Sequence, residues 1–366
     1  MNGGFNLRSD RSVNTVAINT YCKYTSYGSM LQCFALTKVL ENLGVDSFLV
    51  NEWPHMTAEK YAELLFPFDL THLRYWLFYT MHKNLLLKQY TNSQRFVEDN
   101  IKISYFNGYE AIKSSPPVAD LYLSGSDQVF HPDQCNPLFF LDYVDDKDKK
   151  VSYAASMGKI EIADGKRKEF ERLLKSFSSI SIREDDAAKV ISECLNRNVE
   201  VHIDPTFLIN KEDWRKIAME YPVSKPYVLV YPLFWDKSLN KELRSIHNKY
   251  DIDVITVGNS YTNAFATKHI WDASVQQFLW LIDNAQAVIT SSFHGVSLST
   301  ILNKKVSIVV DPNSSSRLNS LIHNLGLSVI PICDVLRYSF DYSQVNQRIV
   351  LEQERSDRYF KEILGK

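Results

Sequence analysis

The chain has 366 residues, 45% of them hydrophobic and 23% charged, and this length suits two globular domains better than one core. The formal net charge of −2 argues against a nucleic-acid partner, which usually leaves a strongly basic face. Five scattered cysteines without metal-ligand spacing predict reduced thiols and no metal site. The sequence has no bilayer-spanning apolar stretch, and residues 1–8 have no apolar signal core, so we expect a cytoplasmic protein.

The first fifty residues predict a parallel β-α-β unit. Its elements are expected as a strand at 13–20, a helix at 30–43 and a second strand at 46–51. The loop before the helix contains Gly28, which would let a ligand approach the backbone closely. A single such glycine is a weak signal, because most tight loops before helices contain one.

Residues 52–108 interrupt this pattern and are predicted to form a helical, aromatic and basic insertion centred on residues 73–88. Aromatic rings mixed with Lys and Arg suit a membrane interface or a lipid-linked substrate. They equally suit an ordinary helix that covers a sheet edge, which is the more common arrangement. Both interpretations stay open at this point.

Two further series of alternating strands and helices follow, separated by a proline-containing break at 220–226. The expected strands are 120–124, 151–156, 179–182, 199–204, 227–231, 254–258, 287–290 and 306–310. The expected helices are 164–177, 185–195, 237–248, 274–284 and 316–325, with a helical tail from about 342. Strands that alternate with helices indicate open parallel sheets covered on both faces.

We therefore expect an α/β protein with two Rossmann-like domains that face each other across a cleft. The first domain is predicted at 1–215, including the insertion at 52–108, and the second at 216–340. A helical tail at 341–366 is expected to pack back on the first domain.

Polar clusters fall at the predicted carboxyl ends of several strands: 26–29, 125–128, 183–184 and 291–295. Ligands bind beyond these ends in open parallel sheets, so the clusters are candidate binding loops. In the last cluster, His294 lies at a strand-turn-helix junction whose helix N-terminus suits an anionic ligand. The alternative is a structural turn in which the histidine only caps the helix.

Several motifs resemble those of the polysaccharide pyruvyl transferase family, in family order from about residue 13 to about residue 330. The matching segments are Tyr27-Gly28-Ser29-Met30-Leu31-Gln32, Leu123 to Phe130, Ser179 to Glu184, Asp204-Pro205-Thr206, Phe278 to Ala285, Thr290 to Ser297, and Asn303-Lys304-Lys305. The resemblance implies a fold similar to GT-B glycosyltransferases. It also implies transfer of pyruvate from phosphoenolpyruvate onto two hydroxyls of a sugar, which forms a cyclic ketal in a bacterial capsule, exopolysaccharide or cell-wall polymer.

On this resemblance the donor is expected to bind the second domain and Arg183. The candidate donor-binding residues are Ser291, Ser292, His294, Gly295, Arg183, Arg317 and Lys305. Arg183 can hold a carboxylate or phosphate bidentately, although a surface ion pair with Glu184 is the alternative. A protonated His294 can hold the phosphate or give a proton to the methylene carbon. Some members have an arginine where this chain has Ser292, so Arg317 or Lys305 would have to replace its charge.

The acceptor is expected on the first domain. The candidate acceptor-binding residues are Tyr27, Gly28, Ser29, Gly125, Ser126, Asp127 and Gln128. Asp127 is the candidate base for the attacking hydroxyl, and a plain Asx-turn is the alternative. Some relatives have an acidic residue at the position of Ser29, so no base can be assigned there.

The expected function is a pyruvyl (ketal) transferase that uses phosphoenolpyruvate as donor and needs no cofactor. Its acceptor would be a saccharide, lipid-linked at the inner face of the membrane, where the protein would make peripheral contact. Two alternatives remain: a GT-B nucleotide-sugar glycosyltransferase, and a saccharide-binding relative without catalysis.

Overall fold

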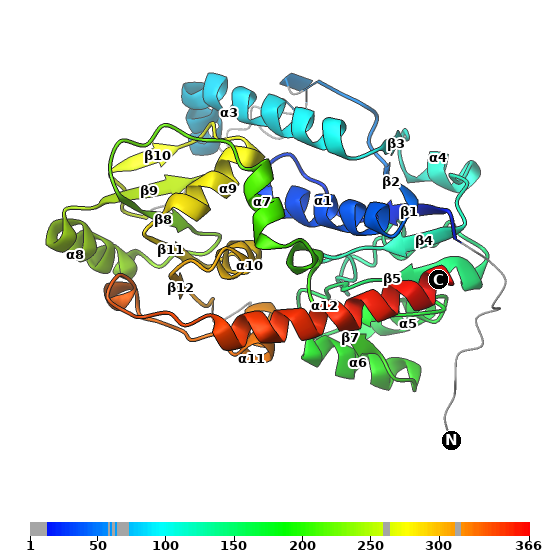
Figure 1. Ribbon diagram of the computed structural model, residues 1–366. Helices are drawn as coiled ribbons and strands as arrows, with labels where there is room; N and C mark the ends of the chain where they lie inside the picture. The colour runs from blue at the N-terminus through cyan, green and yellow to red at the C-terminus, as the bar shows by residue number, and fades with distance from the viewer. Residues whose placement is uncertain (1–12, 58, 61–62, 64–72, 259–263, 312–315) are drawn as a thin grey trace.

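The computed structural model describes residues 13–57, 59–60, 63, 73–258, 264–311 and 316–366. The segment at 1–8, part of the predicted insertion (58, 61–62 and 64–72) and the loop at 312–315 lie outside the described residues. Two five-stranded parallel sheets form the framework (Figure 1). The first contains β1 (Thr15–Asn19), β2 (Asp46–Asn51), β3 (Ile103–Tyr105), β4 (Leu121–Ser124) and β5 (Lys150–Ser152). The second contains β8 (Tyr227–Tyr231), β9 (Asp253–Val257), β10 (Lys268–Ile270), β11 (Ala287–Thr290) and β12 (Val306–Ile308).

Both sheets have the same strand order. The first runs β3-β2-β1-β4-β5 and the second β10-β9-β8-β11-β12, which in both cases matches the first five positions of the Rossmann order 3-2-1-4-5-6. The central strands are apolar and buried on both faces, as helices covering a parallel sheet require. The predicted α/β fold with two Rossmann-like domains is therefore confirmed.

A short pair of strands extends the first sheet beyond β5. β6 (Ser181–Ile182) pairs with β7 (Glu200–Val201), and isolated bridges join Ala155 to Ile182 and Val151 to Ser179. This extension places residue 183 at the same carboxyl edge as the end of β4, which is where the candidate site is built.

Helices cover both sheets. Up to residue 217 they are α1 (Tyr27–Asn42), α3 (Leu73–Asn100), α4 (Tyr109–Ser114), α5 (Asp164–Leu174), α6 (Asp185–Leu195) and α7 (Lys211–Ile217), with the 3₁₀ turn η3 (Pro205–Leu208) before α7. After it they are α8 (Asn240–Tyr250), α9 (Val275–Asn284), α10 (Phe293–Ile301), α11 (Ser316–Leu325) and α12 (Ser343–Leu364). None of the helices in the described part of the chain is both long and apolar enough to cross a bilayer.

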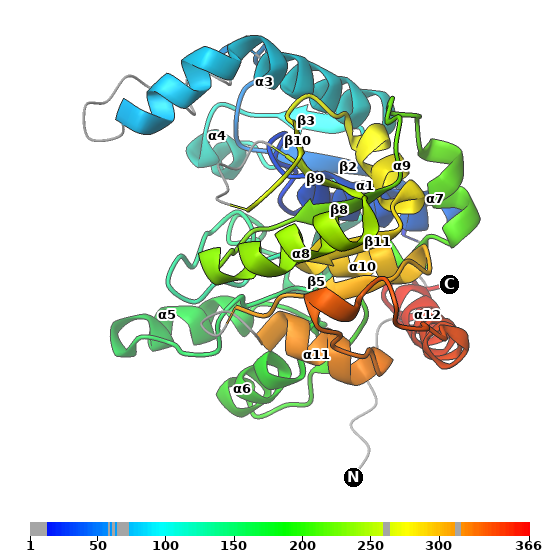
Figure 2. The same cartoon turned by 90° about the vertical axis from the view of Figure 1, so that its left-hand side faces the viewer.

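The long helices α3 and α12 lie on opposite sides of the molecule, and both reach across the two domains (Figures 1 and 2). α3 contacts α1 of the first domain and α9 of the second. α12 leaves the second domain and packs on the first, where Phe360 lies against Tyr153 with ring centroids 4.4 Å apart. Tyr359 donates a hydrogen bond to the Ser152 carbonyl at 2.7 Å.

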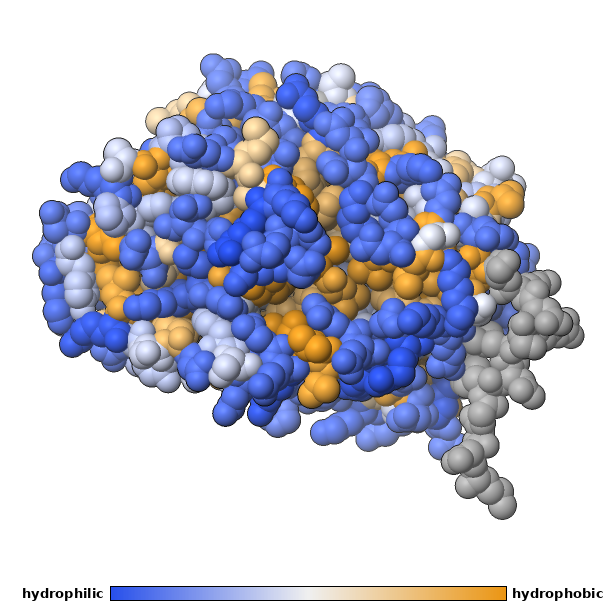
Figure 3. Space-filling model, in the orientation of Figure 1, coloured by the Kyte–Doolittle hydropathy of each residue, from blue (hydrophilic) through white to orange (hydrophobic). Residues whose placement is uncertain are grey.

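The cores of the two domains are continuous. Tyr27 of α1 stacks on Phe278 of α9, with centroids 4.4 Å apart and planes 10° apart, and donates to the Ala273 carbonyl at 2.8 Å. Figure 3 shows this face of the molecule as mostly hydrophilic, with hydrophobic side chains exposed in smaller patches. The domains therefore meet through buried aromatic packing, which stabilises more than polar surface contact does.

Two edge strands were missed from the sequence. β3 lies inside the predicted helical insertion at 52–108, and β10 follows residues outside the described part of the chain. Each has only three residues, too few for an alternating pattern to stand out. The prediction of a wholly helical insertion is therefore wrong at β3, while α3 accounts for its centre.

Candidate active site

His294 is held in the first turn of α10. β11 ends at Thr290, and Ser292 caps the helix by accepting a hydrogen bond from the Gly295 backbone at 3.3 Å. His294 is the second residue of the helix and only 7% exposed. Its imidazole therefore lies at the positive end of the helix dipole, which favours anions.

The first turn of α1 packs directly against this imidazole. A Cβ atom added at Gly28 would lie 2.4 Å from Nδ1 of His294, which no side chain can tolerate. Ser26 caps α1 by accepting from the Ser29 backbone. Gly28 thus allows helix N-termini from two domains to meet at one histidine.

Arg183 forms a buried ion pair on the first-domain side. Its Nη1 donates to Oδ2 of Asp204 at 2.6 Å and to Oγ of Ser126 at 3.2 Å. Ser126 in turn donates to the same carboxylate oxygen at 2.7 Å. The guanidinium stacks on the ring of Phe293, 3.9 Å from its centroid, so the second domain supports its face.

Asp204 lies between side chains of the two domains. Its Oδ2 lies 3.6 Å from Nε2 of His294, and its Oδ1 accepts from the backbone and hydroxyl of Thr206. Burial alone would raise the pKa of Asp204, but its interactions with His294 and Arg183 and the hydrogen bonds it accepts hold that pKa well below its ordinary value. Asp204 is therefore ionised and faces both Arg183 and His294.

Two buried nitrogen atoms of this group have no hydrogen-bond partner: Nη2 of Arg183 and Nε2 of His294. Buried donors without partners are costly, and such atoms are expected where a ligand binds. A cavity of about 540 Å³ borders Arg183, Asp204 and Phe293, and its lining among the described residues does not include His294. The arrangement can bind an anion that carries several acceptor oxygens.

Arg317 and the loop after β4 form the adjoining wall. With the Gln128 amide oriented so that its oxygen faces the guanidinium, it accepts from both terminal nitrogens of Arg317 at 3.0 and 2.9 Å. Burial lowers the pKa of Arg317, and the charge of Arg183 adds to the decrease. Asp127 has a positive φ of 72°, a strained conformation for a residue other than glycine, and its Oδ1 accepts from the Gln128 backbone.

Other predicted donor-binding residues serve the turn itself. Ser291 accepts from the Leu233 and Phe234 backbones and donates to the Phe234 carbonyl, while Ser292 caps α10. A Cβ at Gly295 would lie 2.4 Å from Oγ1 of Thr290. These residues shape the junction that presents His294.

Lys305 lies away from the group. It directly precedes β12, whereas His294 follows the carboxyl end of β11, and the two strands are parallel. Lys305 is therefore at the opposite edge of the sheet, where its ammonium donates to the Leu336 carbonyl at 2.8 Å. The arrangement does not bring it to Arg183 or His294.

Three of the predicted acceptor-binding residues, Tyr27, Ser29 and Gly125, make structural contacts. Tyr27 is buried in the domain interface described above. The hydroxyl of Ser29 accepts from the Lys23 backbone at 3.1 Å. A Cβ at Gly125 would lie within 3.0 Å of Leu36 and Thr20. Ser126 contacts Asp204 and Arg183, and Gln128 contacts Arg317, whereas Asp127 accepts from the Gln128 backbone between them.

The residue that sequence reasoning missed is Asp204. It belongs to a motif that supported the resemblance, but an Asp before Pro-Thr is typical of a helix cap, and it does cap η3. Its partners are 21 and 90 positions away, so no local signal indicated its role. Among the described residues, no group of three or more His, Cys, Asp or Glu side chains is placed to hold a metal ion.

Solved structures share this fold at low sequence identity. S. aureus MnaA in a co-structure with UDP is 10% identical with a TM-score of 0.56, covering 96% of this chain and 97% of that chain. A putative UDP-N-acetylglucosamine 2-epimerase from Listeria monocytogenes is 8% identical with a TM-score of 0.55, covering 96% of each chain. A UDP-GlcNAc 2-epimerase from Neisseria meningitidis bound to UDP-GlcNAc is 9% identical with a TM-score of 0.55, covering 95% and 100%.

These neighbours are GT-B-type proteins, and at such identities they show the fold alone. Among proteins of curated function the sequence has no significant match. The profile of the family described as polysaccharide pyruvyl transferase matches residues 27–313, which include Arg183, Asp204 and His294. The chain therefore belongs to the polysaccharide pyruvyl transferase family.

Proposed function

We propose that this protein transfers pyruvate from phosphoenolpyruvate onto a sugar of a bacterial surface polysaccharide precursor and forms a cyclic ketal. The observation that carries the proposal is the pair of buried nitrogen atoms without a hydrogen-bond partner, Nη2 of Arg183 and Nε2 of His294, in side chains from two domains that both face the Asp204 carboxylate. Phosphoenolpyruvate has a carboxylate and a phosphate, so two separate donors match its two anionic ends. No cofactor is part of the proposal.

The charges around the site support an anionic donor. Arg183 and Arg317 place two guanidinium groups beside each other, and burial raises the pKa of Glu184, which lies 3.5 Å from Arg183. Arg317 would supply the positive charge that some members have at the position of Ser292. The cavity borders Arg183 rather than His294, so the proposal includes a small shift between the domains when the donor binds.

In the proposed reaction, a protonated His294 gives a proton to the methylene carbon of phosphoenolpyruvate. The neighbouring carbon becomes electron-deficient, and a sugar hydroxyl attacks it while Asp127 takes the hydroxyl proton. The C–O bond to phosphate then breaks, and phosphate leaves with its electron pair. A second hydroxyl closes the ketal, and its proton leaves with the phosphate. The proton on Asp127 returns to His294 through solvent, so phosphoenolpyruvate and a diol yield the ketal and inorganic phosphate.

The acceptor is proposed to be lipid-linked, with the protein in the cytoplasm in peripheral contact with the inner face of the membrane. Leu77, Met81 and Leu85 support this location, because they form an exposed apolar row at four-residue spacing along α3. Co-sedimentation with anionic vesicles tests it. The variant Met81→Glu should lose vesicle binding, and unchanged binding contradicts membrane contact through this row.

The reaction is tested by measuring phosphate release from phosphoenolpyruvate across a panel of saccharide acceptors, with the ketal identified by mass spectrometry. His294→Gln should abolish turnover, while His323→Gln, an exposed histidine on α11, should leave it unchanged. Transfer from a UDP-sugar without use of phosphoenolpyruvate would instead establish a glycosyltransferase. Saccharide binding without any turnover would establish a non-catalytic relative.

A further inference from the structure

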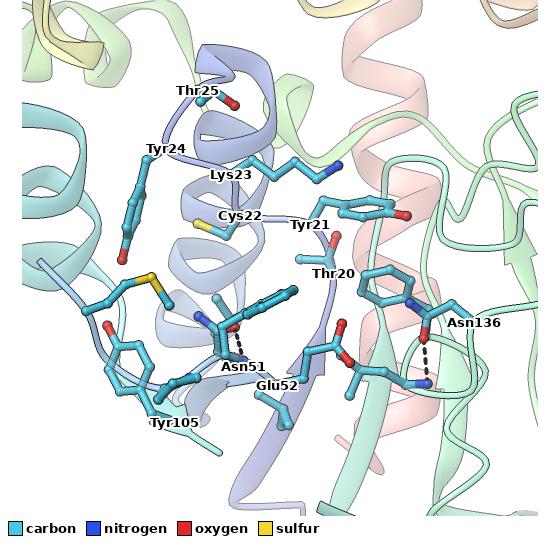
Figure 4. A pocket seen from close by; sticks show the side chains of 17 residues that line it. Thr20, Tyr21, Cys22, Lys23, Tyr24, Thr25, Asn51, Glu52, Tyr105 and Asn136 are labelled. Carbon is cyan, nitrogen blue, oxygen red and sulfur yellow. Dashed lines mark hydrogen bonds between the residues drawn. The ribbon is translucent and has the colours of Figure 1, made fainter. Parts of the chain in front are cut away.

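A second cavity, of about 480 Å³, lies at the carboxyl ends of β1, β2 and β3 in the first domain. Rings from three separate segments line it: Tyr21 and Tyr24 after β1, Trp53 after β2, and Tyr105 at the end of β3. Figure 4 shows Tyr24 and Tyr105 on one side of the open space and Tyr21 on the other. Phe139 completes the wall, with its centroid 4.4 Å from that of Tyr21.

Polar groups lie between these rings. Asn51, Glu52 and Asn136 line the same cavity, and Figure 4 shows Asn51 and Glu52 at its base and Asn136 beside Tyr21. Aromatic faces bind the apolar C–H faces of a sugar ring, and carboxylate and amide groups bind its hydroxyls. Trp53 is 59% exposed, so a large ring stands at the edge of the cavity without being needed in the core.

The charge of the lining favours an uncharged ligand. Lys23 and Glu52 are the charged residues that line the cavity among those described, and they have opposite signs. The Lys23 ammonium lies 4.5 Å from the centroid of the Tyr21 ring, and burial raises the pKa of Glu52. A nucleotide diphosphate would meet Glu52 with one lysine to offset it, whereas a neutral hexose ring meets no such repulsion.

The cavity adjoins the loop that carries Asp127. Thr20 lines the cavity and donates from its hydroxyl to the Ser126 carbonyl at 2.6 Å. Burial raises the pKa of Tyr21, and the charges of Asp127 and Glu52 on either side add to the rise. A saccharide in the cavity therefore extends toward Asp127 and the donor group.

We propose that this cavity is a saccharide subsite, where uncharged sugar rings of the acceptor stack on Trp53 and Tyr105 while the reacting ring lies at Asp127. The assignment of these rings to an acceptor rests on the proposed function. The cavity selects the acceptor through rings that do not react, so it determines specificity rather than chemistry.

The test is binding of the full-length protein to an array of bacterial glycans, followed by calorimetry with the glycan bound most tightly. Trp53→Ala should weaken that binding about tenfold, which corresponds to the loss of one stacked ring. Tyr338→Ala, an exposed aromatic in the second domain, should leave it unchanged. No glycan bound by the wild type, or an affinity of Trp53→Ala within twofold of wild type, overturns the subsite.

A separate readout distinguishes this inference from the proposed function. Stabilisation by phosphoenolpyruvate, measured as a rise in Tm, should be the same in Trp53→Ala and wild type, because Trp53 is not part of the donor group. In one outcome, glycans bind, Trp53→Ala weakens their binding, and phosphoenolpyruvate raises the Tm of neither protein. The subsite is then supported, and the proposed pyruvyl transfer is contradicted. If phosphoenolpyruvate stabilises both and no glycan binds, the subsite alone fails.

Discussion

At the scale of single residues, the Asp204 carboxylate faces two side chains that come from different domains, the Arg183 guanidinium and the His294 imidazole. Its Oδ2 receives Arg183 and Ser126 and faces His294, so one oxygen fixes the geometry of the group. Removing one partner of such a buried pair leaves an uncompensated charge, which costs far more than the pair itself contributes.

Asp204→Asn is therefore expected to destabilise the protein by about 3–5 kcal/mol and to lower kcat about a hundredfold, because Arg183 loses its closest counter-ion and His294 the negative charge beside it. Denaturant unfolding and phosphate release measure the two effects. The matched control is Asp133→Asn, which breaks an exposed pair with Lys159 and should change stability by less than about 1 kcal/mol. Equal effects of the two variants would contradict the role of Asp204.

His202, two residues before Asp204, is expected to make the stability of the protein depend on pH. Burial lowers its pKa to about 4, with Arg355 adding to the decrease, and its Nδ1 lies 2.8 Å from Oγ of Ser181. Glu200, 3.6 Å away, acts in the opposite direction but is half exposed. The unfolded chain takes up the proton at its ordinary pKa of 6.5, so the stabilisation is complete above pH 6.5 and is lost as the pH falls toward 4.

The expected loss of unfolding free energy between pH 7.5 and pH 5 is about 2 kcal/mol, from the two pKa values of His202. His202→Gln should remove most of this slope, and denaturant unfolding at both pH values measures it. A slope in the variant as steep as in wild type would show that other groups cause the dependence.

Sequence reasoning identified some site residues and missed others for a physical reason. His294 and Arg183 follow strand ends, where parallel sheets place ligands, and this local signal located them. Asp204 acts through contacts with distant segments, and Lys305 was misplaced because nearness in the chain to His294 does not mean the same edge of the sheet.

At the scale of elements, the site depends on the close approach of the first turns of α1 and α10. Gly28 makes this approach possible, because its Cα lies against the His294 imidazole. A glycine in the first turn of a helix is otherwise unfavourable relative to alanine. The packing of the two domains at Gly28 therefore offsets the lower helix propensity of glycine.

Gly28→Ala is expected to displace the imidazole and lower kcat/KM at least about tenfold, since even small misplacements of a reacting group cost this much. The matched control is Gly165→Ala, the second residue of α5, where an added Cβ meets no atom within 4 Å. The control should leave activity unchanged and raise stability by up to about 1 kcal/mol. Wild-type activity in Gly28→Ala would contradict the packing.

Long helices could be predicted from the sequence, whereas the short edge strands could not. α6 and α11 have the predicted bounds because the apolar spacing that defines an amphipathic helix is a local property. β3 and β10 are three-residue edge strands that form only because a neighbouring strand pairs with them. Their formation is a tertiary effect, which local patterns do not contain.

At the scale of the whole molecule, α12 ties the end of the chain to the first domain. Phe360 is fully buried against Tyr153, and Gln353 donates to the Phe207 carbonyl at 2.6 Å. Because α12 starts beside the second domain, it limits how far the domains separate.

Phe360→Ala should destabilise the protein by about 3–5 kcal/mol, the usual cost of removing a buried ring from a packed core. Thermal or denaturant unfolding measures this effect. Val350→Ala, on the exposed face of the same helix, should change stability by no more than about 0.5 kcal/mol. If α12 does not stabilise the first domain, both Phe360→Ala and Val350→Ala will leave the free energy of unfolding unchanged, which would contradict this role.

The proposed function requires that Arg183 of the first domain and His294 of the second bind the same phosphoenolpyruvate molecule. Its most direct test is calorimetric titration of phosphoenolpyruvate into wild type, Arg183→Lys, His294→Gln and the exposed control His323→Gln. We predict that each site variant weakens binding at least about tenfold, as loss of a charge-assisted hydrogen bond requires, and that the control binds like wild type. Affinities of both site variants within twofold of wild type would contradict the shared donor site.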